Sequence, residues 1–303
     1  MTHPKFVWIE PTKGTGKRRI IHTDLAAISS FGIRYGPINF RQSHTSPTSF
    51  DLGIPSLKKS PGVEVIVCSR PRHVVVRSHI LDGNPLQTTN WDLLILLRSP
   101  RNAIPSHLRE SYVKSEYSIQ AGIPSKLLST FADRDAKLKC EASSIPTTGA
   151  LDIARGKASS QSLELSPDLL KFMDELLKTH DKPVTMLNLL HFHQCGKQEY
   201  FKYGQGFVKV ASKIGGDAKL VGNVVHPAAD QCDSRGNPDR PEEDWWNEIS
   251  IVHYPSIRHF CDMLASEEYQ EINTKHRLNA LKDTFLLCTT EFDVEEGGIP
   301  AKL

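Results

Sequence analysis

The stretch WNEISIVHYP, Trp246 to Pro255, has a near copy earlier in the chain, WDLLILLRSP, Trp91 to Pro100. Each opens with Trp followed by an acid or an amide, continues as an apolar run, and ends in two more polar residues before Pro. Apolar runs of this length, bounded by turn residues, are typical of buried β-strands. Two such strands in one chain predict two copies of one small fold.

The segments around these two strands repeat in the same order. Upstream of each lie an apolar run that follows a Gly and then the triplet Gly-Asn-Pro; downstream of each lies a helical pattern. The first copy has VEVIVCS at 63–69, GNP at 83–85 and HLRESYVKSEYSI at 107–119, and the second has AKLVGNVV at 218–225, GNP at 236–238 and FCDMLASEEYQEI at 260–272. This common order supports a tandem duplication.

The second copy has the clearer pattern of the two. Its periodicity predicts strands at 184–193, 218–225, 246–255 and 284–292, and helices at 199–214, 257–272 and 274–283. Ser256 is placed to cap the helix that follows it. The order βαββαβ is that of a ferredoxin-like domain.

The first copy is less regular before Gly62. Its first strand is expected at FVWIE, 6–10, and turn-rich sequence follows. We therefore predict an α+β protein with a degenerate ferredoxin-like domain over 1–140, a Ser-, Ala-, Thr- and Gly-rich linker over 141–165, and a ferredoxin-like domain with an extra N-terminal helix over 166–303. Ser166 suits the cap of that helix, whose apolar face is expected to pack on the second domain.

Composition limits the classes of partner. With 303 residues, 39% hydrophobic and 24% charged, the chain can form two ordinary globular domains. A formal net charge of +2 argues against nucleic acid or an anionic membrane as a partner. The chain has no apolar run of transmembrane length, no signal-peptide core and no CxxC pair among its six cysteines, so a cytoplasmic location is expected.

Common catalytic motifs are absent from the sequence. It contains no GxSxG, HExxH or GxGxxG. GTGK at 14–17 lacks the spacing and the following Ser or Thr of a phosphate-binding loop, so we expect a turn there.

Polar residues at two strand ends of the second copy indicate a site. The first strand ends in His191 and His193, and the third in His253 and Tyr254. We expect these strands to be parallel neighbours, so that three imidazoles and a phenol converge for acid–base chemistry. His191, His193 and Cys195 alternate and could instead bind a metal, although no carboxylate is placed to complete such a site. The histidines could also cap strand ends without any function.

Other polar positions interrupt the apolar strands. Asn188 lies between leucines, where its amide needs either neighbouring backbone or a bound ligand as a partner. Alternation puts Ile249 and Ile251 on a face that we expect to pack on helices, with His253 beside them. The opposite face could line a cavity and comprises Trp246, Glu248, Ser250 and Tyr254.

The connection 226–245 is long for a hairpin loop. Such loops are usually lids over a site or solvated excursions. His226, Trp245 and Trp246 lie at its base.

Several short motifs of the second half occur together in a known family. They are MLNLLHF from Met186, Tyr200 and Tyr203, Gly215-Gly216, Tyr254-Pro255-Ser256, SEEYQEI from Ser266, and Arg277 with Leu281 and Asp283. Over about 184–292 the chain thereby resembles small uncharacterised dimeric α+β barrel proteins, in a longer fungal-type form. That family shares a superfamily with antibiotic-biosynthesis monooxygenases, muconolactone isomerases and polyketide cyclases. The first half matches less well, with Arg98 and Ser99 at the positions of His253 and Tyr254.

The resemblance implies two sheets packed face to face around an apolar pocket. Such sheets usually come from two chains, but tandem copies would let one chain form an intramolecular dimeric α/β barrel, as a monomeric pseudo-dimer or within a homodimer. It also implies a hydrophobic, aromatic or polyketide-like substrate, and chemistry that needs no cofactor and no metal.

We therefore expect an isomerase, cyclase or lyase of secondary metabolism that is driven by proton transfer. The catalytic candidates are Asn188, which would orient a carbonyl, and the proton carriers His191, His226, Glu248 and His253. The candidates for substrate binding are Tyr203, Trp246, Ser250, Tyr254 and Arg277. The alternatives are a cofactor-free monooxygenase of an electron-rich phenol and a non-catalytic small-molecule binding protein.

Overall fold

The computed structural model describes residues 3–11, 53–81, 83–99, 104–155, 165–227, 233–236 and 239–293. GTGK and part of the predicted linker lie outside them. The described strands are β1 (Lys5–Pro11), β2 (Glu64–Val76), β3 (Leu93–Arg98), β4 (Val113–Gly122), β5 (Val184–Phe192), β6 (Asp217–Val224), β7 (Glu248–Tyr254) and β8 (Leu281–Glu291).

The described α-helices are α1 (Ile54–Lys58), α2 (Gly83–Thr88), α3 (Ser106–Tyr112), α4 (Ser125–Ser129), α5 (Phe131–Glu141), α6 (Ala150–Arg155), α7 (Pro167–Leu177), α8 (Gly196–Ala211), α9 (Ile257–Ala265), α10 (Glu267–Ile272) and α11 (Leu278–Ala280). Short 3-10 turns cover 142–144, 212–214 and 242–244, and a π-helical turn, η5, covers Asn273–Arg277. None of the helices that the structure describes is both long and apolar enough to cross a membrane.

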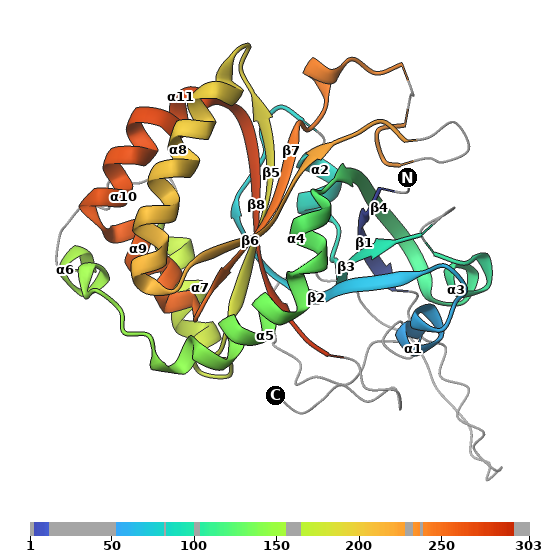
Figure 1. Ribbon diagram of the computed structural model, residues 1–303, viewed down its shortest axis with the longest axis horizontal. Coiled ribbons are helices and arrows are strands. Elements are labelled where there is room, and N and C mark those ends of the chain that lie inside the picture. The colour runs from blue at the N-terminus through green and yellow to red at the C-terminus, as the bar shows by residue number, and fades with distance from the viewer. Residues whose placement is uncertain are drawn as a thin grey trace, which may run out of the picture.

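The eight strands close into an antiparallel barrel in the order β1-β3-β2-β8-β5-β7-β6-β4. Within it the strands of the first half run β4-β1-β3-β2, and those of the second half run β8-β5-β7-β6, so the two halves have the same internal order. Two antiparallel seams join the halves, β2 with β8 and β4 with β6. The fold is therefore α+β, and Figure 1 shows its helices outside the strands.

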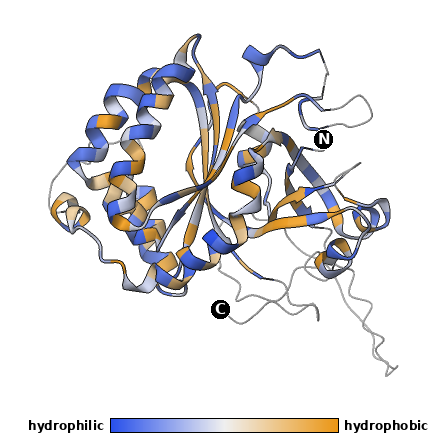
Figure 2. Ribbon diagram, viewed as in Figure 1, coloured by the Kyte–Doolittle hydropathy of each residue, from blue (hydrophilic) through white to orange (hydrophobic). Residues whose placement is uncertain are grey.

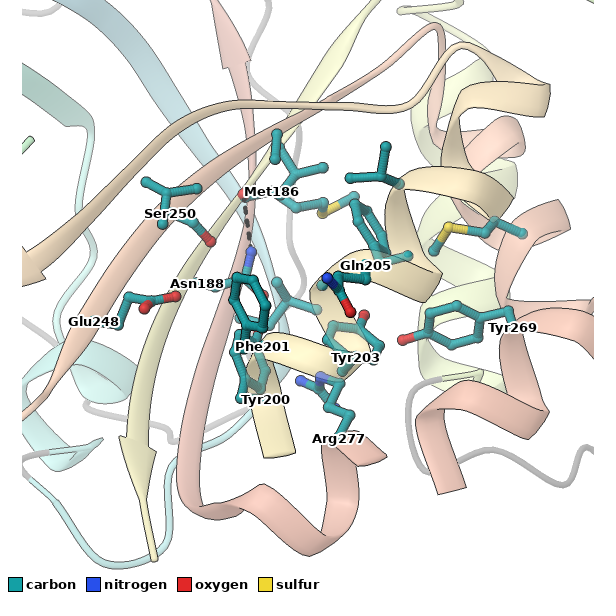
Figure 3. A pocket seen from close by; sticks show the side chains of 18 of the residues that line it. Met186, Asn188, Tyr200, Phe201, Tyr203, Gln205, Glu248, Ser250, Tyr269 and Arg277 are labelled. Atoms are coloured by element: carbon teal, nitrogen blue, oxygen red, sulfur yellow. Dashed lines mark hydrogen bonds between the residues drawn. The ribbon is translucent and has the colours of Figure 1, made fainter. Parts of the chain in front are cut away.

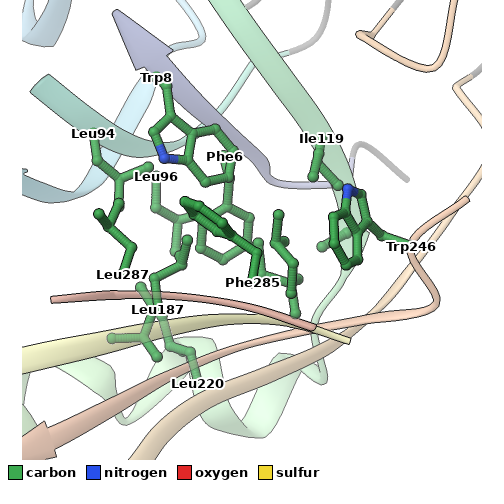
Figure 4. Packing of buried hydrophobic residues seen from close by; sticks show 14 of the residues in the cluster. Phe6, Trp8, Leu94, Leu96, Ile119, Leu187, Leu220, Trp246, Phe285 and Leu287 are labelled. Atoms are coloured by element: carbon green, nitrogen blue, oxygen red, sulfur yellow. The ribbon is translucent and has the colours of Figure 1, made fainter. Parts of the chain in front are cut away.

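The barrel interior is packed with large apolar side chains from both halves (Figure 4). Alternate residues of each strand point inward, among them Phe6, Trp8, Leu94, Leu96, Leu187, Leu189, Ile249, Ile251, Phe285 and Leu287. The expectation of a pocket between two facing sheets is wrong, because this core fills the space between them. The expectation that the two isoleucines pack on helices is also wrong, because their face of β7 points into the barrel.

The outer face of the second half is covered by helices. Its residues, including Met186, Val252 and Leu286, form a second core with α7 to α10. Figure 2 shows hydrophobic and hydrophilic residues alternating around these helices, as amphipathic helices require. The packing predicted for α7 is confirmed, and Ser166 caps it by accepting a hydrogen bond from the Leu169 amide at 3.1 Å.

The outer face of the first half is covered differently. The buried residues of α1 and α3 pack on the odd-numbered residues of β1 and β3 in a third core. The helix predicted at 107–119 is wrong after Tyr112, since Val113–Gly122 forms β4. Strand β4 pairs with β1 from Lys5↔Gln120 to Pro11↔Val113, and this long-range pairing overrides the local helical pattern.

Buried carboxylates fix connecting segments to the second half. Asp283 accepts hydrogen bonds from the Ser78 hydroxyl at 2.6 Å and from the backbone of His79, Ile80 and Leu81. Asp262 accepts from the Thr148 hydroxyl and the Leu151 amide, so the described part of the predicted linker is attached to α9.

Candidate functional site

A cavity of about 430 Å³ lies between the outer face of the second half and its helices (Figure 3). This volume is within the range of small-molecule sites. The sheet contributes Met186, Asn188, Glu248, Ser250, Val252, Tyr254 and Leu286, and the helices contribute Lys197, Tyr200, Phe201, Tyr203, Gln205, Phe207, Phe260, Met263, Tyr269 and Arg277, among others.

The sheet wall of the pocket brings three polar side chains together. Asn188 of β5 is the cross-strand partner of Ser250 of β7, and opposed residues project to the same face of a sheet. Glu248 lies two residues before Ser250 and therefore on that face as well. The Asn188 amide donates to the Met186 carbonyl at 3.3 Å, which leaves a second N–H and the amide oxygen to face a ligand.

Glu248 has the chemistry of an acid–base group. Burial raises the pKa of its carboxyl, and the nearby Lys197 ammonium opposes that shift. Lys197 is itself exposed and donates to the Asn223 side chain at 2.7 Å. A carboxyl with a raised pKa can exchange protons with a carbon acid nearer to neutral pH than an ordinary glutamate can.

The helix wall is aromatic. Tyr200, Tyr203 and Phe207 follow one another at helical spacing along α8, with ring centroids 5.1 and 5.8 Å apart. Tyr269 of α10 meets the Tyr203 ring edge-on at 6.5 Å. Phe201 lines the pocket although 68% of it is exposed, which places it at the opening. The pocket is therefore mainly aromatic on this side and open to solvent near the start of α8.

Arg277 is the buried cation of the helix wall. It ends the π-helical turn η5 and is only 4% exposed. Single π-helical turns occur frequently at functional sites. Tyr254 also lines the pocket, and its hydroxyl lies 3.7 Å from the Met263 sulfur.

The predicted convergence of histidines is wrong, because β5 and β7 are antiparallel. Leu190 pairs with Glu248 at one end and Val184 with Tyr254 at the other. His191 and His193 therefore lie at the opposite end of these strands from His253. The fold requires this arrangement, since every neighbouring pair of strands in the barrel is antiparallel.

None of the catalytic histidine candidates lines the pocket. His191 is buried on the inward side of the sheet, with Nδ1 3.2 Å from the Asn247 oxygen. His226 contacts the Arg235 guanidinium at 2.8 Å. His253 is 1% exposed on the inward face, and neither ring nitrogen has a hydrogen-bond partner among the described residues.

Trp246 also lies away from the pocket. It is part of the barrel core, and its indole N–H donates to the Tyr117 hydroxyl at 3.3 Å. The described part of the predicted lid is attached to β4 instead, because Ser234 exchanges hydrogen bonds with Ser118.

The alternation on which the metal alternative depended ends early. Strand β5 stops at Phe192, and Cys195 has φ 64° at the start of α8. Among the described residues, no group of three or more His, Cys, Asp and Glu is arranged to hold a metal ion.

Of the predicted site residues, the pocket unites Asn188, Tyr203, Glu248, Ser250, Tyr254 and Arg277. Four other lining residues were not predicted from the sequence: Lys197, Phe201, Gln205 and Phe207. Their signal was present as aromatic residues at helical spacing around Gly204, but that pattern predicts core packing equally well. Gly204 itself lines the pocket, and a Cβ there would meet no atom beyond its own turn of α8 within 4 Å, so this position leaves open space in the pocket.

Comparison with known proteins assigns no family. No family model matches the sequence, and no curated protein matches it significantly. A solved protein of unknown function from Rhodopseudomonas palustris is 22% identical, with 41% of this chain and 91% of that protein covered and a TM-score of 0.31. The methylated form of that protein gives 22% identity, coverage of 41% and 89%, and a TM-score of 0.32. Scores this low indicate neither family nor activity.

Proposed function

We propose that the pocket binds an apolar small molecule with a carbonyl group and catalyses a proton transfer on it without a cofactor. The reaction class is an isomerisation, cyclisation or elimination. The observation that supports this most is the placement of Asn188, Ser250 and Glu248 on one face of adjacent strands, inside a pocket lined mainly by apolar and aromatic side chains. The two halves would be tandem ferredoxin-like units, in line with their equal strand order and with the family resemblance.

The chemistry divides between two side chains. The Glu248 carboxylate removes a proton from a carbon next to the substrate carbonyl, and the electron pair of the broken C–H bond moves to form an enolate. The Asn188 amide N–H donates a hydrogen bond to the enolate oxygen. Protonated Glu248 then returns the proton to another carbon in an isomerisation. In a cyclisation the enolate carbon attacks a second carbonyl of the same ligand, and the proton goes to that carbonyl oxygen; in an elimination the enolate collapses and the proton goes to the leaving group, which departs with the electron pair of its bond. In each case the substrate is neither oxidised nor reduced.

Solvent deuterium exchange tests this proposal without knowledge of the natural substrate. A panel of aryl ketones from acetophenone to 2-acetylnaphthalene is incubated with the protein in D₂O, and loss of the α-proton signal is followed by NMR. We expect catalysed exchange that Glu248→Gln reduces by about 10²–10⁴-fold, the usual contribution of a general base. Since burial raises the pKa of Glu248, the rate should fall with decreasing pH earlier than for an ordinary glutamate.

The matched control is Glu243→Gln, which alters an exposed glutamate outside the pocket. Its exchange rate should equal that of the wild type. Ketones that bind without any catalysed exchange would show a binding protein and overturn the proton-transfer proposal. Equal exchange by Glu248→Gln and wild type would remove Glu248 from its role.

A further inference from the structure

The charged residues of the pocket wall are unbalanced. The wall includes two cations, Lys197 and Arg277, and one carboxylate, Glu248. Because burial raises the pKa of that carboxyl, its negative charge is the weaker part of the balance. A pocket with this lining attracts anionic ligands.

The two cations differ in their surroundings. Lys197 lies at the exposed start of α8, where its ammonium donates to Asn223 at 2.7 Å. Arg277 is 4% exposed and projects from η5 into a wall of tyrosines. Charge-assisted hydrogen bonds strengthen when water is excluded, and a planar guanidinium fits both oxygens of a carboxylate. Arg277 is therefore the better anchor for an anion.

The two walls keep the opposite charges apart. Arg277 comes from the helix wall and Glu248 from the sheet wall (Figure 3). An anionic group held at Arg277 would leave Glu248 opposite the rest of the ligand. On the helix wall beside Arg277, the rings of Tyr200, Tyr203 and Phe207 provide a continuous aromatic surface. A flat aromatic body packs well on such a surface.

We infer that the ligand of this pocket is an aromatic carboxylic acid whose carboxylate is held by Arg277. This inference rests on the proposed function, because it names the substrate class of the same pocket. It adds that the ligand is an anion with a flat apolar body, and it makes Arg277 a specificity-determining residue.

A matched pair of probes tests the inference directly. 2-Naphthoate and its methyl ester have nearly the same aromatic body, but only the acid is charged. Binding of each is measured by isothermal titration calorimetry to the full chain at neutral pH. We expect the acid to bind at least about ten-fold more tightly than the ester, because a buried charge-assisted pair would add this much affinity.

Variants assign this preference to one residue. Arg277→Gln should remove the preference while the ester still binds, and Arg277→Lys should keep part of it because it keeps the charge. Lys197→Gln should retain the preference. Arg258→Gln, which removes an exposed arginine paired with Asp152 outside the pocket, is the matched control and should behave as the wild type.

The outcomes separate this inference from the proposed function. If neither probe binds the wild type, the pocket is not a site for a flat aromatic acid and the inference fails, while the ketone exchange assay still decides the proposed function. If the ester binds as well as the acid, the inference fails and the proposed function stands. If Lys197→Gln removes the preference, Arg277 is not the anchor. If Arg277→Gln fails to fold, the inference is judged from two other results. These are the preference of the wild type for the acid and the partial retention of that preference in Arg277→Lys.

Discussion

At the scale of single residues, His253 links the fold to pH. Desolvation, followed in size by the nearby Lys219 ammonium, is the main cause that lowers the pKa of this imidazole to about 3. Lys139 and His259 act in the same direction and Asp135 opposes them. In the unfolded chain the imidazole titrates near its ordinary pKa of about 6.5. Between those two values the unfolded state binds more protons, so stability falls as pH decreases below about 6.5.

We predict that His253→Leu removes part of this acid sensitivity. Urea unfolding at pH 7.5 and pH 5.0 measures it. A single group contributes at most about 1.4 kcal/mol per pH unit, so the wild type should lose up to about 2 kcal/mol more than the variant between these pH values. His226→Leu, at a half-exposed histidine outside the core, should lose as much as the wild type. Equal losses in all three proteins would contradict the prediction.

Some residues of the candidate site can be predicted from the sequence, and others cannot. Asn188, Glu248 and Ser250 can be predicted from sequence, because a polar residue in an apolar strand needs a partner. His253 was placed at the wrong end of the site, because β5 and β7 were expected to be parallel. The predicted order βαββαβ in fact makes them antiparallel: the crossover helix α8 makes β5 and β6 run in the same direction, and the β6–β7 connection then reverses the chain.

At the scale of elements, two of the three glycines of α8, Gly196 and Gly204, are expected to respond in opposite ways to substitution by Ala. A Cβ at Gly196 would lie 2.3 Å from the Ala280 carbonyl oxygen, whereas one at Gly204 would have nothing within 4 Å. Gly204→Ala should therefore raise stability by about 0.5–1 kcal/mol, the helix propensity difference. Gly196→Ala should lower it by about 1–3 kcal/mol, the cost of overpacking. Thermal unfolding of both variants checks this, and a stabilised Gly196→Ala would contradict the close approach to α11.

Element boundaries were predictable where apolar periodicity was strong. All four strands of the second half fall within a few residues of their predicted positions. Helix α5 was missed because Phe131 is its only buried residue, so it has little periodicity to detect. The helix predicted at 274–283 is shorter and partly π-helical, because β8 begins at Leu281. Ser256 precedes α9 as expected, but its hydroxyl contacts His259 rather than capping the helix backbone.

At the scale of the whole molecule, the two halves depend on each other. The seam between β2 and β8 runs from Ser69↔Glu291 to Val76↔Leu286, and the seam between β4 and β6 contains Ala121↔Val224 and Gly122↔Asn223. The interior core takes side chains from both halves. Separation would expose the inner face of each half to water, at about 25 cal/mol per Å² of apolar surface. Because the inner face of each half is apolar, we expect neither half to remain folded alone.

We therefore predict that the described fold unfolds as one cooperative unit. Three of the four tryptophans, Trp8, Trp245 and Trp246, lie in the shared core, so their fluorescence reports barrel opening. Far-UV circular dichroism is dominated by helices, and most helical residues cover the second half. If the halves are coupled, both signals change at the same urea concentration. Fluorescence that changes first, with the helical signal retained, would show that the second half stays folded after the barrel opens. A single-residue test strengthens the result: Phe285→Ala, a core change in β8, should lower both midpoints equally and cost about 3–5 kcal/mol.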